Sequence, residues 1–343
     1  MKHPLALLMN DLHISKDNIA EFQKNWNEAL DLCKKFEIED ICIGGDVFTA
    51  RAAQTLSVLL AIKQCYLKAH ENGIYLTIAE GNHDLVNQEL FEGYNHISAP
   101  YPGVEIVDDY KVIQWEDCDI TLAMMSYFPE RGSFEKRLNE LKDKLSHDKV
   151  ELSTTILYIH EEIDGCLGNF TTDNSCSQSW FYGFKSVLVG HIHNRISLRG
   201  TDIEYIGSSR QGSFGEDEEK GYTILYDDGS YEFVKNEVNT RYKNVDVDFD
   251  DIDSVEKEPD DRYKVKLKIH CTDVQSKLVD RKALLEKVNK VELVTEKTQA
   301  VEVNESDISV KFDKDGIKSE YVGFCTEKNI DSSLGIKYLN QIK

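Results

Sequence analysis

Histidine, aspartate and asparagine recur at the ends of short apolar segments of this chain. Five segments end in Asp11-Leu12-His13, Gly45-Asp46, Gly81-Asn82-His83-Asp84, His160 and Gly190-His191-Ile192-His193. A lone histidine is most often a satisfied loop residue, but histidines at five such ends indicate a shared site. The side chains offer oxygen and imidazole ligands and no thiolate, which favours manganese, iron or zinc over a thiolate zinc centre or an iron–sulfur cluster.

The number of candidate ligands bears on how many ions the site would hold. The metal-binding candidates are Asp11, His13, Asp46, Asn82, His160, His191 and His193. This set is too large for one ion and suits two, and a carboxylate such as Asp46 is suited to bridge them. Two metals about 3.5 to 4 Å apart stabilise both the attacking and the leaving oxygen of an in-line phosphoryl displacement. The pattern therefore predicts phosphate-ester chemistry.

The elements that must position these ligands are strands and helices in alternation. Continuous apolar runs, typical of strands buried on both faces, occupy residues 5–9, 41–43, 74–79, 155–159 and 186–189. Helical spacing of apolar residues occupies 18–36 and 52–70 between them. The pattern predicts a layered α/β domain. Its ligands would lie just past the carboxyl ends of strands, where such sheets usually bind ligands.

The charge of the chain argues against a protein that binds nucleic acid through a basic surface. The 343 residues carry a formal net charge of −22. Residues 241–343 contain 19 Lys/Arg and 22 Asp/Glu, so nearly all of the excess, −19, belongs to residues 1–240. Two bound dications would offset part of this charge where a phosphate must sit. If the phosphate belonged to a nucleic acid, a protein of this composition would depend on its metals and on a partner to hold that ligand.

Cysteine usage and hydropathy bear on the compartment. The eight cysteines form no CxxC pair, so we expect reduced, mostly structural thiols and a cytoplasmic protein. No stretch approaches the roughly 20 apolar residues that a membrane span needs. We therefore expect no membrane partner.

The five motifs, in this order, resemble those of the calcineurin-like metallophosphoesterase family. Their spacing and the region after residue 240 are most similar to the SbcD-type DNA nuclease subunits and their phage counterparts. The resemblance implies an α/β fold: a layered metallophosphoesterase β-sandwich flanked by helices, with a small C-terminal α+β capping domain and a helical tail. It also implies two divalent ions, manganese being preferred and magnesium the alternative.

The resemblance further assigns roles to the motif residues. One metal would be held by Asp11, His13, Asp46 and His193. The second would be held by Asp46, Asn82, His160 and His191. His83 would act on the scissile phosphate or the leaving oxygen, with Asp84 orienting its ring. The family's second aspartate after the Gly-Asp motif is replaced here by Thr49.

The resemblance divides the chain at residues 240 and 315. Residues 1–240 would form the nuclease domain and residues 241–315 a DNA-positioning cap. In the cap, the sequence predicts a strand at 263–269, a helix at 273–290 and a strand at 291–294. Residues 316–343 would form a helical tail that docks on the coiled coil of an SMC-like ABC ATPase of the SbcC type. The alternative is that the tail packs on its own domain.

Four basic residues are candidates for contact with the DNA backbone. Lys264, Lys266 and Lys268 alternate along the predicted strand, and Arg210 follows the last ligand motif. For the lysines the alternative is an ordinary exposed strand face, and for Arg210 an ordinary surface arginine.

Three functions are compatible with the sequence. The leading hypothesis is a two-metal DNA phosphodiesterase, the nuclease subunit of an ATPase–nuclease complex, acting on duplex ends as an exonuclease and on single strands as an endonuclease. The resemblance also implies a homodimer. The alternatives are a phosphomonoesterase or cyclic-nucleotide phosphodiesterase, and an inactive scaffold for the ATPase. The chain has no P-loop motif, so any ATP dependence must come from a partner.

Overall fold

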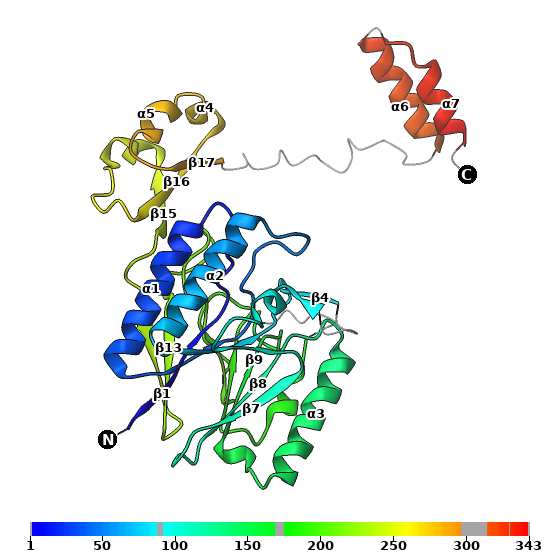
Figure 1. Ribbon diagram of the computed structural model, residues 1–343. Helices are drawn as coiled ribbons and strands as arrows, with labels where there is room; N and C mark the ends of the chain where they lie inside the picture. The colour runs from blue at the N-terminus through cyan, green and yellow to red at the C-terminus, as the bar shows by residue number, and fades with distance from the viewer. Residues whose placement is uncertain (1, 88–91, 169–174, 296–313, 329, 342–343) are drawn as a thin grey trace. The chain divides into compact units, whose positions relative to one another are not determined.

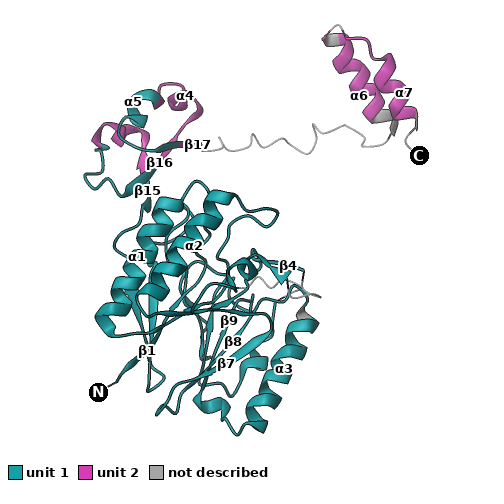
Figure 2. Ribbon diagram, viewed as in Figure 1, with its two compact units in different colours: residues 1–245, 255–267, 282–291 teal, residues 246–254, 268–281, 292–343 magenta. Residues whose placement is uncertain are grey.

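The computed structural model describes residues 2–87, 92–168, 175–295, 314–328 and 330–341. The chain divides into two compact units, coloured separately in Figure 2. The first consists of residues 1–245, 255–267 and 282–291, and the second of residues 246–254, 268–281 and 292–343. All seven candidate metal ligands belong to the first unit. The boundaries expected at 240 and 315 stay predictions, and residues 296–313, just before the second, lie outside the described residues.

The first of two six-stranded sheets contains three of the predicted strands. In spatial order its strands are β14 (Tyr231–Lys235), β13 (Gly221–Tyr226), β1 (Pro4–Met9), β2 (Asp40–Ile43), β3 (Tyr75–Ala79) and β6 (Val104–Val107). The four strands β1, β2, β3 and β6 pair in parallel in that order, whereas β13 is antiparallel to both of its neighbours, β1 and β14. The carboxyl ends of β1, β2 and β3 therefore meet at one edge of the sheet.

The second sheet contains the other two predicted strands. Its spatial order is β11 (Ile196–Ser197), β12 (Ile203–Tyr205), β10 (Ser186–Val189), β9 (Thr155–Ile159), β8 (Thr121–Met125) and β7 (Tyr110–Gln114). The central strands β12, β10, β9 and β8 are parallel. The ends of β9 and β10 thus lie side by side, as the positions of His160 and His191 require.

The two sheets form a sandwich between layers of helices, and Figure 1 shows α1 and α2 on one side and α3 on the other. Strand pleating explains the layers, because alternate side chains of one strand enter different cores. Leu8 packs with Met124 and Tyr158 between the sheets, while Leu7 packs under the helices. The predicted α/β fold, a layered β-sandwich flanked by helices, is confirmed.

The helices are amphipathic and bury one face each. Two match the predicted spans closely, namely α1 (Ile19–Phe36) and α2 (Leu56–Glu71). Trp26 of α1 is fully buried and donates its indole N–H to the carbonyl of Cys65 in α2, 2.8 Å away. The third helix, α3 (Arg131–His147), covers the outer face of the second sheet with apolar residues that include Leu138.

The C-terminal region contains a three-stranded sheet and two terminal helices. The sheet has the order β15 (Arg241–Asp248), β16 (Tyr263–Cys271) and β17 (Lys290–Thr295). The terminal helices are α6 (Lys314–Glu327) and α7 (Ser333–Gln341), as the predicted helical tail requires.

The prediction of a single helix at 273–290 is wrong. This segment forms two short helices, α4 (Asp273–Ser276) and α5 (Arg281–Leu285). A capping box of Thr272 and Gln275 starts α4, which ends within one turn. The apolar positions do not form one buried face, since Val274 and Leu278 are exposed while Leu284 is buried. Without such a face, a long helix gains little from packing.

Shorter elements complete the described chain. They are β4 (Leu85–Asn87), β5 (Glu92–Gly93) and the 3-10 helices η1 (Tyr94–Ser98), η2 (Leu152–Thr154), η3 (Gln178–Phe181) and η4 (Phe249–Ser254). All eight cysteines are free thiols and seven are buried, as expected for structural cysteines. Among the described residues, no helix is both long and apolar enough to cross a membrane.

Candidate metal centre

Five strand ends bring the candidate ligands together in the first unit. Asp11 and His13 follow β1, Asp46 follows β2, and the Asn82-His83-Asp84 segment follows β3. His160 follows β9, and His191 and His193 follow β10. The loops also hold one another, because Asp11 N–H donates to the carbonyl of Gly45 and His13 N–H to that of Asp46, both at 3.0 Å.

Several of these residues adopt backbone angles that non-glycine residues rarely take. The φ angles are 52° at Asp11, 43° at His13, 52° at Asp46 and 78° at His191. Such left-handed positions cost free energy and concentrate at functional sites. Here all four residues lie in the loops that directly follow β1, β2 and β10. The loops are also closely packed at Gly81, because a Cβ there would collide with Asp46.

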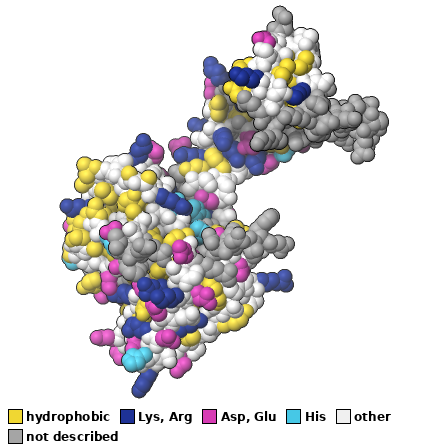
Figure 3. Space-filling model, turned by 90° about the vertical axis from the view of Figure 1, so that its right-hand side faces the viewer, with side chains coloured by type: hydrophobic (Ala, Val, Ile, Leu, Met, Phe, Trp, Pro, Cys, Tyr) yellow, Lys and Arg dark blue, Asp and Glu magenta, His cyan; other side chains and the backbone are white. Residues whose placement is uncertain are grey.

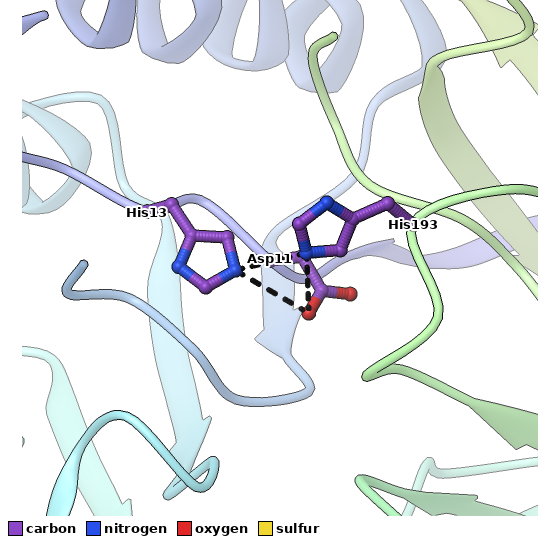
Figure 4. Close-up of side chains that lie close together, drawn as sticks. All are labelled: Asp11, His13 and His193. Atoms are coloured by element: carbon purple, nitrogen blue, oxygen red, sulfur yellow. Dashed lines mark hydrogen bonds and ion pairs between the residues drawn. The ribbon is translucent and has the colours of Figure 1, made fainter. Parts of the chain in front are cut away.

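The first ligand group consists of Asp11, His13 and His193, drawn in Figure 4. Nε2 of His13 and Nε2 of His193 each lie 3.9 Å from Oδ1 of Asp11, and 3.0 Å from each other. Oδ1 of Asp11 is buried and has no hydrogen-bond partner among the residues that the structure describes. Two imidazole nitrogens and an unpaired carboxylate oxygen therefore converge on one small space.

The second ligand group consists of Asp46, His160 and His191. Nε2 of His160 lies 3.4 Å from Oδ1 of Asp46. The amide oxygen of Asn82 lies 3.2 Å from that nitrogen and 3.0 Å from Nδ1 of His191. The other carboxylate oxygen of Asp46, Oδ2, lies 3.5 Å from Nε2 of His13 in the first group. Asp46 thus stands between the two groups with one oxygen toward each.

The titratable groups of the site shift one another's pKa values. Burial would raise the pKa of Asp46, but the neighbouring His160 and His13 hold it below its usual range. Burial likewise opposes a proton on His160, but Asp46 and then Asp11 raise the pKa of that histidine to about 10. Burial, with His160 nearby, lowers the pKa of His191 to about 4. A proton on His160 therefore supplies the positive charge that the buried carboxylates require.

A divalent cation fits this donor set better than a proton does. The unpaired Oδ1 of Asp11 faces Nε2 of His13 and Nε2 of His193, each 3.9 Å away. A buried polar atom without a partner is costly, and a cation would satisfy several such atoms at once. Carboxylate, amide oxygen and neutral imidazole suit divalent cations such as manganese, iron and zinc.

Backbone carbonyls fix two of the ligand histidines in one tautomer. Nδ1 of His160 lies 2.8 Å from the carbonyl oxygen of Gly44, and Nδ1 of His13 lies 3.3 Å from that of Phe48. A carbonyl can only accept, so each Nδ1 carries a proton and each Nε2 is turned toward the site. Nδ1 of His193 instead faces a carboxylate, that of Glu216, at 3.2 Å. Glu216 was not singled out from the sequence.

His83 lies beside the site, and the expectation for Asp84 needs correction. Nδ1 of His83 is 2.7 Å from the carbonyl oxygen of Thr49, and its Nε2 is 4.0 Å from Oδ2 of Asp46. Asp84 is fully buried and accepts N–H groups of Val47, Phe48 and Gly81 at 2.9 to 3.1 Å. The Thr49 carbonyl therefore contacts the His83 ring, and Asp84 ties together the two loops that carry Asp46 and His83.

A cavity of about 620 Å³ opens onto the site. Its lining includes His13, Asp46, Asn82, His83, His191 and His193. Arg51 and Lys264, which line the same cavity, add positive charge at its wall, and Arg51 was not foreseen. Figure 3 shows histidine side chains reaching the surface of the molecule.

The four DNA-contact candidates differ in accessibility. Arg210 is buried, and its guanidinium donates to the carbonyls of Leu12 and His13 at 2.8 Å, which braces the first ligand loop. Lys264 is exposed, and Lys266 and Lys268 are partly buried on β16, whose alternate residues are buried. The alternation predicted for this strand is thus present, while DNA contact stays a prediction for all four residues.

These two groups of candidate cation ligands, which both face the Asp46 carboxylate, are compatible with a dinuclear metal centre. Residues 5–195, more than half of the chain, match the family described as calcineurin-like phosphoesterase. The chain belongs to this family, which confirms the resemblance drawn from its five motifs.

Two relatives and one solved structure extend the comparison. The chain is 27% identical over 290 residues to the DNA double-strand break repair protein Mre11 of Methanocaldococcus jannaschii, covering 82% of this chain and 71% of that protein. It is 24% identical over 204 residues to the SbcD subunit of the nuclease SbcCD of Staphylococcus saprophyticus, covering 54% of each. A dimetal phosphatase from Danio rerio aligns with 64% of this chain and 91% of its own, with a TM-score of 0.44 and 10% identity.

Proposed function

We propose that this chain is a two-metal DNA phosphodiesterase, the nuclease subunit of an ATPase–nuclease complex. The observation that carries the proposal is the position of Asp46, whose two oxygens face His13 at 3.5 Å and His160 at 3.4 Å. Support for DNA as the substrate comes from the relatives, both named as DNA repair or nuclease proteins. The match to Mre11 spans 290 residues and so must extend beyond the family segment at 5–195.

The ligands divide into two sets in this proposal. Asp11, His13, Asp46 and His193 would hold one cation, and Asp46, Asn82, His160 and His191 the other. When bound, such cations offset the charge of the phosphate and promote attack by water near neutral pH. Manganese is the proposed cation, with magnesium as the alternative.

His83 is the proposed acid–base residue. Its Nδ1 is held by the Thr49 carbonyl, so its Nε2 is left toward the cavity. When the ring is doubly protonated, the proton on Nε2 could pass to the leaving oxygen or donate to the phosphate as negative charge develops. The ring also packs edge-on against His13, with centroids 4.9 Å apart, which keeps it next to the ligands.

The acidity of the chain limits how it can hold DNA. Residues 1–240 carry a net charge of −19, and the basic groups that line the cavity include Arg51 and Lys264. These few charges would release few counterions and so provide modest affinity. We therefore propose exonuclease action on duplex ends and endonuclease action on single strands that depends on a partner for efficient DNA capture.

The test of the proposed activity uses the full chain with manganese. The substrates are a labelled blunt duplex, a circular single strand and p-nitrophenyl phosphate, and Asp46→Asn controls for contaminating nuclease. We expect cleavage of both DNAs, loss of cleavage with a chelator and little ester hydrolysis. Ester hydrolysis with intact DNA would favour a phosphomonoesterase, and inactivity on all three would favour a scaffold.

The terminal helices are the proposed docking site for an SMC-like ABC ATPase. Phe324 of α6 and Leu334 of α7 are 56% and 64% exposed, so both helices present apolar side chains. Truncation after residue 315 should preserve basal cleavage and abolish co-purification with a co-expressed ATPase of the SbcC type. Retention of the ATPase by the truncated chain would place the dock elsewhere.

A homodimer and a cytoplasmic location complete the proposal. Sedimentation equilibrium of the purified chain tests the first. A mass equal to one chain at micromolar concentration would contradict it.

A further inference from the structure

The ring of His193 has a different kind of partner from those of its neighbours. His13 and His160 present Nδ1 to backbone carbonyls, which are neutral and fixed by the loops. Nδ1 of His193 lies 3.2 Å from Oε1 of Glu216, a carboxylate from a separate segment 23 residues away. The side chain of His193 is 33% exposed, against 17% for His13 and 0% for His160. Packing therefore constrains the ring of His193 least, and its orientation depends most on a hydrogen-bond partner.

Glu216 is itself held in place. Oε2 of its carboxylate accepts the N–H of Gly212 at 3.0 Å, and Oε1 accepts the hydroxyl of Ser213 at 3.2 Å. The backbone carbonyl of Glu216 accepts the side-chain amide of Gln211 at 2.8 Å. The Glu216 side chain is 12% exposed. It therefore reaches His193 as a positioned carboxylate.

The same segment also fixes the backbone of His193. Lys220, whose side chain is fully buried, donates from Nζ to the carbonyl of His193 at 2.7 Å and to Oδ1 of Asn194 at 2.8 Å. Ser208 N–H donates to the same carbonyl at 3.0 Å. With the backbone fixed by Lys220 and the ring by Glu216, Nε2 of His193 is directed at Asp11 and His13.

We infer that Glu216 is a positioning residue for the metal centre: through His193 it sets the affinity of the Asp11–His13–His193 group for its cation. A carboxylate that accepts Nδ1–H fixes the tautomer and makes Nε2 a stronger donor, and losing such a partner typically weakens metal binding about 10- to 100-fold. This inference rests on the proposed function in that His193 must hold a cation.

Three variants separate the contributions of Glu216. Glu216→Gln keeps an acceptor for Nδ1–H but removes the charge, and Glu216→Ala removes both. Ser213→Ala deletes one hydrogen bond of the same loop to Glu216 and should weaken the site less than Glu216→Ala does. A further variant, Glu219→Gln, at an exposed carboxylate that pairs with Lys235, controls for the loss of one negative charge.

The readout is manganese binding by calorimetry on the full chain, together with ¹⁵N NMR of the histidine rings in the metal-free protein. We expect two sites in wild type. One site should weaken progressively from wild type through Glu216→Gln to Glu216→Ala, by about 10- to 100-fold in the last and by less in Ser213→Ala, while the other site, and both sites in Glu219→Gln, keep wild-type affinity. The spectra should show Nδ1 of His193 protonated in wild type and a mixture of tautomers in Glu216→Ala.

Two results would overturn the inference. One is wild-type affinity at both sites in Glu216→Ala, and the other is an equal loss in Ser213→Ala, which would mark a general effect of the loop. Failure of the proposed function is distinguishable, because the wild-type chain would then bind fewer than two manganese ions.

Discussion

The two ligand groups of the site are built from the same residue types but sit in different surroundings. In the buried group, the side chain of His160 is 0% exposed and that of Asp46 is 3% exposed, and the ring of His160 is fixed by the Gly44 carbonyl. In the open group, His193 is 33% exposed and its ring depends on the Glu216 side chain. His160 thus belongs to the protein core, whereas both histidines of the open group are partly exposed, and both groups contribute residues to the cavity wall.

This difference suggests a division of labour between the two cations. A cation among Asp46, His160 and His191 would have one fully buried imidazole beside it and should exchange more slowly. A cation among Asp11, His13 and His193 would face the cavity and depend on positioning by a side chain. Asp46 couples the two, because its oxygens face both groups.

Removing the coupling residue should have the largest effect. Asp46→Asn should lower the affinity for both cations and reduce DNA cleavage by at least about 1000-fold, since each cation contributes several kcal/mol of charge stabilisation. Calorimetry with manganese and a cleavage assay measure the two effects. A variant that still binds two ions as wild type does would show that Asp46 bridges nothing.

Removing His83 should spare both groups and affect only catalysis. His83→Ala should bind two cations with wild-type affinity and cleave DNA about 100- to 1000-fold more slowly, because only a proton donor is lost. Parallel binding and rate measurements separate the two properties. Cleavage at close to the wild-type rate would rule out the proposed role.

Stability should distinguish the buried group from the open one. Without metal, His160→Ala leaves the buried Asp46 carboxylate without its main partner and should cost about 3 to 5 kcal/mol in the free energy of unfolding. His193→Ala, at a partly exposed position, should cost less than about 1 kcal/mol. Urea unfolding in the presence of a chelator measures both. Equal losses would mean that the two groups do not differ in this way.

The pH dependence should be a smaller effect with a definite sign. In the metal-free chain the pKa of His160 is raised to about 10, and that of Asp46 is held below its usual range. Their mutual stabilisation should therefore be lost in acid as Asp46 protonates, and in alkali as His160 loses its proton near pH 10.

A cation must displace the proton of His160, so affinity at the buried group should rise about tenfold per pH unit from neutrality toward pH 10. Calorimetry in buffers of different ionisation enthalpy counts the released protons. An affinity that does not change with pH would contradict the assignment of His160 as a ligand.

Most of the site was predictable because it follows strand ends. Continuous apolar runs identified β1, β2, β3, β9 and β10, and the polar residues after them necessarily meet where parallel strands end. The helices α1 and α2 were predictable from the spacing of their buried residues. In the 273–290 segment the same reasoning failed, because apolar residues at helical spacing, such as Val274 and Leu278, do not all pack on one face.

The partners of the ligands were not predictable from the sequence. Thr49 contacts His83 through its backbone carbonyl, and a carbonyl has no signature in the residue type. Asp84 is adjacent to His83 in sequence, yet its carboxylate is fully occupied by three backbone N–H groups. Glu216 approaches His193 only through the tertiary fold, and in the sequence it is one acid in a run of four between Glu216 and Glu219.

The left-handed turns at Asp11, His13, Asp46 and His191 have a consequence for the thermodynamics of cation binding. These loops are locked by their own backbone hydrogen bonds, so little chain entropy remains to be lost when an ion arrives. The conformational entropy of these loops is already lost when the protein folds. The unfavourable backbone angles persist because the packing of the surrounding sheets holds the loops in place. Cation association should therefore produce a small heat-capacity change and leave the rigidity of the scaffold almost unaltered.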